Sequence, residues 1–133
     1  MTKKDLAKLV QYWKNGSKIN FDSAKEIGKK TENYVDALFL LHLTTEKILK
    51  AYLVQASGKH SPLSHNLLYL AQLSSLRLTR DKTILLSEIN EFNLECRYPD
   101  DKYTIYKLAN KAMFDNYLKK IEKFRKWILS KLK

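Results

Sequence analysis

The feature that most constrains this chain is a long apolar run, YVDALFLLHLTTEKILKAYLV, at residues 34–54. Its apolar residues cover more than one helical stripe, so a helix here has to contact neighbours on several sides. The run also contains too many polar groups for a membrane span: Asp36, His42, Glu46, Lys47 and Lys50. We therefore expect a soluble protein with a central helix over about residues 34–57, ended by Gly58.

The rest of the chain also favours helices. Three glycines and two prolines in 133 residues are too few for the frequent turns of an all-β domain. Apolar residues at three- and four-residue steps predict a first helix over about residues 3–29, continuous through Gly16. The length fits one compact unit, so the prediction is a single all-α domain over residues 1–133 with five helices.

Cap and stop signals set the later boundaries. Ser64 is expected to cap a short third helix, and Thr79 or Asp81 a fourth. Pro99 disfavours a helical residue before it, so the fourth helix should continue to near Arg97 or Tyr98 and stop there. Two acidic residues follow and are expected to cap a long final helix, namely Asp100 and Asp101.

The charge is strongly positive. Of the net +11, residues 102–133 contribute +8, because ten Lys and Arg face only Asp115 and Glu122 there. This balance favours anionic partners such as nucleic acid, nucleotides or an acidic protein. A solvated basic face accounts for it more simply than a dedicated nucleic-acid groove, because exposed aromatic residues do not interleave with the lysines.

A polar strip interrupts the central helix. His42, Glu46 and Lys50 are spaced by four residues and so share one side of it. A structural interpretation is an ion pair between Glu46 and Lys50, with a histidine satisfying a buried hydrogen bond. A metal site would need His65 as well, without any recognised ligand spacing, so we expect no metal and no cofactor.

Arg97 is a second candidate for chemistry. A guanidinium at a helix end can meet a carboxylate or a phosphate, and both interpretations stay open here. Its carboxylate partners would be Glu46, Asp100 or Asp101. Cys96 is the only cysteine, which excludes an internal disulfide and a thiolate zinc cluster and fits a reducing cytoplasm.

Several segments together resemble a HEPN domain, a small helical family often encoded beside minimal nucleotidyltransferases. They are FLLHLTTEKILKAYLV, HSPLSHNLLYLAQL, ECRYPDDK and the terminal KWILSKLK. The resemblance implies an up-and-down bundle of four core helices with an additional helical piece, commonly a homodimer. It also places several residues at characteristic positions of the family: Glu46, Lys47, Lys50, His65, Arg97, Tyr98 and Pro99.

The resemblance implies two kinds of activity. Many relatives are metal-independent ribonucleases whose arginine is followed by a histidine, with four to six residues between the two. Here that window after Arg97 holds Lys102, Tyr103 and Thr104 in place of a histidine, and lysine and tyrosine titrate far above neutrality. A ribonuclease would therefore need His65 or Tyr103 as the partner of Arg97.

The function we expect is a non-catalytic partner of a minimal nucleotidyltransferase, in a toxin–antitoxin style pair. It would bind nucleotide or RNA phosphate, with candidate contacts at Arg97, Lys50, Glu46, Lys47, His42, His65 and Tyr98. The alternatives are a metal-independent endoribonuclease and a dimerisation module without a ligand. All three are consistent with a cytoplasmic homodimer that does not enter a membrane.

Overall fold

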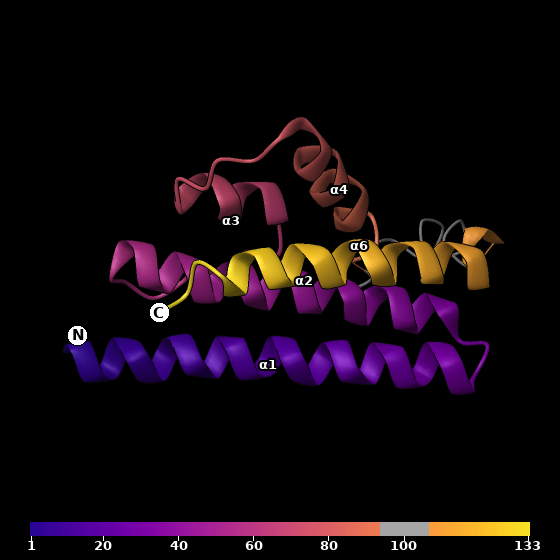
Figure 1. Cartoon of the computed structure of the whole chain (residues 1–133), viewed down its shortest axis with the longest axis horizontal. Helices are drawn as coiled ribbons and strands as arrows, with labels where there is room; N and C mark the ends of the chain where they lie inside the picture. Colours follow the sequence, from indigo (N-terminus) through magenta and orange to yellow (C-terminus); the bar gives the residue numbers. More distant parts are fainter. Residues whose placement is uncertain (94–106) are drawn as a thin grey trace.

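The computed structural model describes residues 1–93 and 107–133, and the regular structure of these residues is helical (Figure 1). The helices are α1 (Lys3–Lys30), α2 (Tyr34–Ser57), α3 (Leu67–Leu73), α4 (Arg80–Asn90) and α6 (Lys111–Leu129). The long helices α1, α2 and α6 lie side by side, and α3 and α4 form a smaller layer next to them (Figure 1). The predicted all-α bundle is confirmed.

The chain direction alternates along the bundle. α2 runs antiparallel to α1, and α3 and α4 bring the chain back so that α6 runs in the same direction as α2 (Figure 1). α1 passes through Gly16 without interruption, as predicted, and a capping box between Thr2 and Asp5 starts it. α2 ends at Gly58, whose φ of 70° is the left-handed conformation that favours glycine.

The cap of α3 differs from the prediction. Asn66, and not Ser64, is the N-cap, because its side-chain oxygen accepts hydrogen bonds from the amides of Leu68 and Tyr69. Ser64 lies too early in the chain and instead accepts a bond from the amide of Asn66 at 3.1 Å. The predicted cap of α4 is confirmed at Thr79, which accepts from the amide of Lys82.

α4 ends at Asn90, so its predicted continuation to near Arg97 is wrong. The amides of Glu91, Phe92 and Asn93 each donate to the carbonyl three residues earlier, which tightens the chain and ends the α-helical pattern. This tightening buries Phe92 against Tyr117 of α6, with ring centroids 4.9 Å apart. Packing against a distant helix therefore sets the end of α4.

The final helix begins later than predicted. Asn110 has an extended backbone and its side chain accepts from the amide of Met113 at 2.9 Å, so α6 starts at Lys111. Asp100 and Asp101 are therefore not its cap. They lie outside the described residues, as do Cys96, Arg97, Tyr98, Pro99, Lys102, Tyr103 and Thr104.

α2 is the centre of the core, as predicted from its apolar surface, which covers more than one helical stripe. It contacts α1, α3, α4 and α6, and most of its side chains are buried. The fully buried ones include Leu38, Leu41, Ile48 and Leu49. The broad apolar surface of α2 is thus covered largely by neighbours within one chain.

A polar contact joins the three long helices. The hydroxyl of Ser17 in α1 donates to the carbonyl of Thr44 in α2 at 2.8 Å and accepts from Nε of Arg125 in α6 at 3.0 Å. Ser17 is fully buried. Burial also lowers the pKa of the Arg125 guanidinium from its usual value. This contact fixes the relative positions of α1, α2 and α6 at one level of the bundle.

Substitution by alanine should have opposite effects on the free energy of unfolding at two glycines of α1. A Cβ on Gly28 would lie 2.2 Å from Cζ of the fully buried Phe114, whereas one on Gly16 would lie 3.0 Å from Cδ of the flexible Lys47 side chain. We expect Gly28→Ala to lower the free energy of unfolding by about 1–3 kcal/mol through overpacking. Gly16→Ala should be neutral or raise it by up to about 1 kcal/mol, because alanine favours a helix.

Urea denaturation of the two variants beside the wild type measures both values. The helix and the chemical change are the same, so each variant is the control for the other. Equal stability of the two would mean that Phe114 does not pack against Gly28.

Candidate functional site

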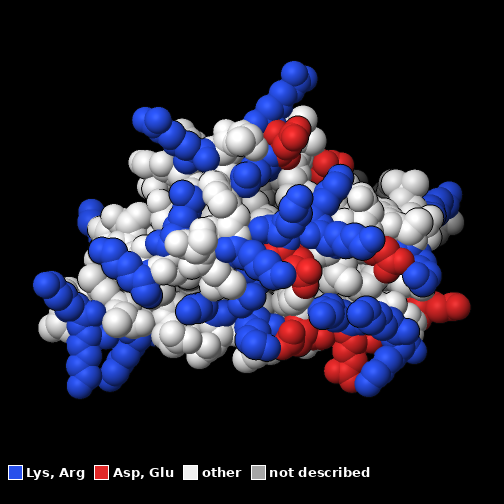
Figure 2. All heavy atoms as spheres, viewed as in Figure 1, with Lys and Arg blue, Asp and Glu red and all other residues white. Residues whose placement is uncertain are grey.

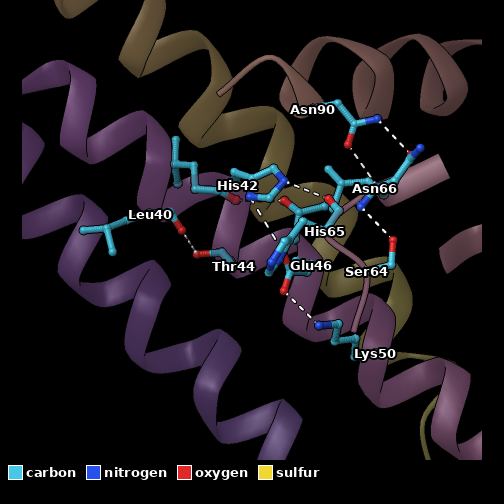
Figure 3. Close-up of polar contacts among 12 residues, drawn as sticks. Leu40, His42, Thr44, Glu46, Lys50, Ser64, His65, Asn66 and Asn90 are labelled. Carbon is cyan, nitrogen blue, oxygen red and sulfur yellow. Dashed lines mark hydrogen bonds and ion pairs between the residues drawn. The ribbon is translucent and has the colours of Figure 1, made fainter. Parts of the chain in front are cut away.

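Three of the residues predicted from the sequence, His42, Lys50 and His65, converge on the carboxylate of a fourth, Glu46 (Figure 3). The four-residue spacing on α2 places His42, Glu46 and Lys50 on one side of the helix. The loop between α2 and α3 then brings His65 to the same place, although it lies 19 residues from Glu46 in the chain. The four residues are called the Glu46 cluster below.

Both oxygens of Glu46 are engaged. Oε2 accepts from Nζ of Lys50 at 3.0 Å, and Oε1 accepts from Nδ1 of His65 at 2.9 Å. The side chains of Glu46 and Lys50 are only 4% and 6% exposed. A buried carboxylate is stable only when it is paired and hydrogen-bonded, so these contacts hold the cluster together.

His42 supports the cluster from inside the protein. Its Nε2 lies 3.1 Å from the carbonyl oxygen of His65, and since a carbonyl can only accept, Nε2 carries the proton. Its Nδ1 lies 4.0 Å from Oε1 of Glu46, and the ring stacks on Phe39. His42 is fully buried, so it positions the backbone of His65 and is not open to a ligand.

Two asparagines hold the loop that carries His65, and the sequence reasoning missed both. Asn90 of α4 donates from Nδ2 to Oδ1 of Asn66 at 3.2 Å and accepts from the amide of Leu67 at 2.9 Å (Figure 3). α4 thereby fixes the start of α3 and the residue before it. Asn66 had a local signal, because it directly precedes an apolar run, but Asn90 had none.

Trp13 of α1 completes the surroundings of Lys50. The Nζ atom of Lys50 lies 5.0 Å from the centroid of the Trp13 ring, within the range of a cation–π contact. The same ammonium is therefore attracted to Glu46 on α2 and to an aromatic ring on α1. Lys50 serves the packing of α1 on α2 as well as the charge of Glu46.

The other predicted residues lie apart from the cluster or outside the described residues. The Lys47 side chain passes over Gly16 of α1 and lines a cavity of about 270 Å³ with Tyr12, Trp13 and Ile19. It does not join Glu46. Arg97 and Tyr98 are not among the described residues, so their relation to the cluster stays a prediction.

Solvent exposure decides which side chain of the Glu46 cluster can contact a ligand. His65 is its one member with substantial access to solvent, at 39% of the side chain, and the Glu46 carboxylate fixes the orientation of its ring. Within residues 1–93 and 107–133, no group of three His, Cys, Asp or Glu side chains has an arrangement that could hold a metal ion. In the same part of the chain, no helix is long and apolar enough to cross a membrane.

Comparisons with known proteins give a family and a fold. A family model described as the HEPN domain matches residues 10–132. No curated protein matches the chain. Among solved structures, the crystal structure of TT1696 from Thermus thermophilus is similar, with a TM-score of 0.77 over 92% of this chain and 98% of that one. The two sequences are 16% identical, so this likeness shows the fold alone.

The pairing of Glu46 and Lys50 can be measured through stability. Glu46→Gln leaves the Lys50 ammonium buried without a carboxylate, and we expect it to lower the free energy of unfolding by about 3–5 kcal/mol. The double variant Glu46→Gln/Lys50→Met removes both charges and should be more stable than the sum of the two single changes implies, by about 1–3 kcal/mol.

Chemical denaturation of the four proteins in this double-mutant cycle gives the coupling. The matched control is the exposed pair Lys111 and Asp115, also four residues apart and 2.6 Å from each other. Asp115→Asn should leave the denaturation midpoint unchanged, because exposed ion pairs contribute little. Additive effects of the Glu46 and Lys50 changes would contradict the pairing.

Proposed function

The chain belongs to the HEPN domain family, and from this premise we propose that it is a non-catalytic partner of a minimal nucleotidyltransferase. The two proteins would form a toxin–antitoxin style pair in the cytoplasm. In this pair the chain contributes a rigid helical surface that binds the nucleotidyltransferase and the phosphate of a nucleotide or RNA.

The observation that carries this proposal is the closed set of contacts around Glu46. One buried carboxylate engages the Lys50 ammonium and the His65 ring, so the polar residues of α2 act on one another. In addition, the three histidines of the chain, His42, His60 and His65, all precede Arg97. The ribonuclease pair that the family resemblance implies is thus incomplete, which favours binding over catalysis.

The phosphate contacts we propose follow from exposure within the cluster. Lys50 is almost completely buried and paired with Glu46, so a phosphate would have to break that pair to reach it. His65 is the more accessible group, and together with Arg97 and Tyr98 it is our candidate for the phosphate. The net charge of +11 provides the long-range attraction for such an anion.

We also propose a homodimer, based on the outer face of α1. Tyr12 and Ile19 of α1 are each 64% exposed, and they line the small cavity beside Trp13 and Lys47. Exposed apolar patches of this kind mark interaction surfaces. A second copy of the chain would cover them, while α2 is covered by its own chain.

The endoribonuclease remains a second candidate because of one specific contact. The 2.9 Å hydrogen bond from His65 Nδ1 to the Glu46 carboxylate holds the imidazole in one orientation. In enzymes that use a general base, a third group orients the base in the same way. With Arg97 on the phosphate, such a histidine could accept the proton of a ribose hydroxyl.

Coexpression with a minimal nucleotidyltransferase tests the leading proposal. We expect one complex in light scattering coupled to gel filtration, and no cleavage of short RNA above background without divalent metal. His65→Ala is the matched variant for the second measurement. Metal-independent cleavage that His65→Ala abolishes would establish the ribonuclease instead, and two separately eluting proteins would contradict the partner role.

The dimer has its own test. Wild-type protein should sediment at about twice the chain mass of 15.6 kDa at micromolar concentration. Ile19→Glu should restore the monomer mass without a change in the unfolding midpoint, because an exposed side chain contributes little to the fold. Ile84→Glu, on the exposed face of α4, is the control and should leave the dimer intact. A monomeric wild type would contradict the proposal.

A further inference from the structure

A groove of about 730 Å³ lies between α4 and α6, away from the Glu46 cluster. This volume is in the range of protein binding pockets. The face of the molecule that carries α6 is crowded with lysine and arginine side chains (Figure 2). The groove therefore opens on a strongly basic surface.

The centre of the groove is apolar. Phe124 and Leu85 form its buried floor, while Ile84 is 47% exposed and Trp127 is half-buried against Phe124. Tryptophan is enriched at the centre of protein–protein interfaces, and here an exposed isoleucine extends the apolar surface around it. The isolated chain leaves this apolar surface in contact with water.

Three lysines surround this centre: Lys82, Lys120 and Lys123. Within residues 1–93 and 107–133, no carboxylate lies within ion-pair distance of any of them, in contrast to Lys50 and Lys111. Nζ of Lys82 lies 4.4 Å from the Trp127 ring centroid, and Lys131 approaches the same ring at 4.9 Å. The positive charge around the groove is therefore available to a partner.

The two acidic residues among the described residues of the groove, Asp81 and Glu88, make no ion pair with these lysines. Glu88 accepts a hydrogen bond from the hydroxyl of Tyr117 at 2.6 Å. Burial and this hydrogen bond raise the pKa of Tyr117, so its hydroxyl stays protonated and continues to donate. Asp81 lies in the first turn of α4, where the helix dipole stabilises a negative charge.

We propose that this groove binds an acidic amphipathic helix of a partner protein. Apolar side chains of that helix would cover Ile84 and Trp127, and its carboxylates would pair with Lys82, Lys120 and Lys123. The inference rests on the proposed function only in that the partner is a protein. It adds the place on this chain and the chemistry of the partner surface.

The apolar centre favours a peptide over a nucleic acid. A phosphate backbone would satisfy the lysines, but it would leave Ile84 exposed, and the side chains of Ile84 and Leu85 offer no hydrogen bond to a base edge. An amphipathic helix satisfies both parts of the groove, because its apolar and acidic residues recur on opposite sides. Charge pairs at the rim would set the orientation, and the apolar centre would supply most of the affinity.

The test uses the full chain with Trp13→Phe, so that Trp127 is the one remaining tryptophan. The probe is a synthetic helical peptide with leucines on one face and glutamates on the other. We expect a saturable change in Trp127 fluorescence that weakens as salt is added. A peptide with the same composition in scrambled order should bind about tenfold more weakly.

Two variants locate the site. Ile84→Ser and Lys120→Glu/Lys123→Glu should each weaken peptide binding by about tenfold or more. Lys119→Glu/Lys126→Glu is the matched control, because it makes the same charge change on exposed residues of α6 that do not line the groove. It should reduce binding far less than the groove variants do. Circular dichroism confirms that each variant is folded.

Three results would overturn the proposal: no binding of the peptide, equal binding of the scrambled peptide, or an equal loss in the control variant. Displacement of the peptide by oligouridylate at matched charge would assign the groove to nucleic acid instead. The complex with the nucleotidyltransferase is measured separately on the wild type. A negative result for peptide binding in the groove can therefore be distinguished from a negative result for the partner role.

Discussion

A helix that is apolar on more than one side must be enclosed, and the arrangement of this protein follows from the enclosure of α2. α1 covers one side along its length, α6 a second, and α3 and α4 most of the remainder. The short helices also carry the chain back toward the end of the bundle where α6 begins, and α6 lies parallel to α2 (Figure 1). Each of the other helices is thus positioned by its contact with α2 or with a helix that touches it.

Enclosure creates a difficulty for the polar residues of α2, and the Glu46 cluster resolves it. A carboxylate that is 4% exposed loses its hydration and needs charged or hydrogen-bonding partners within the protein. Lys50 supplies one from the same helix and His65 another from the loop. The loop between α2 and α3 is held to the core in this way, and Asn66 and Asn90 hold its other end. The polar contacts of the site therefore follow from the burial of Glu46 in the core.

The sequence predicts what is decided locally. The limits of α1 and α2, the cap at Thr79 and the convergence of His42, Glu46 and Lys50 depend on spacing or on adjacent residues, and all of these predictions are confirmed. The features that the sequence did not predict depend on contacts between segments that are far apart in the chain. Phe92 reaching Tyr117 ended α4 early, and no pattern near residue 13 indicates that Trp13 meets Lys50. Asn66 could have been predicted as the cap from the sequence, but Ser64, two residues earlier, is also a favourable cap residue.

The burial pattern of α1 divides this helix into two halves of unequal stability. Its buried residues, Ser17, Phe21, Ala24 and Gly28, all belong to the second half, and residues 3–16 include no buried side chain. The first half is therefore held mainly by the helical hydrogen bonds, the capping box at Thr2 and a few half-buried contacts such as Trp13. Its amides should exchange with solvent by local opening, while those beyond Ser17 exchange only when the whole bundle unfolds. Whatever binds over Tyr12 would stop this opening, so the first half of α1 can report on assembly without any change in the core.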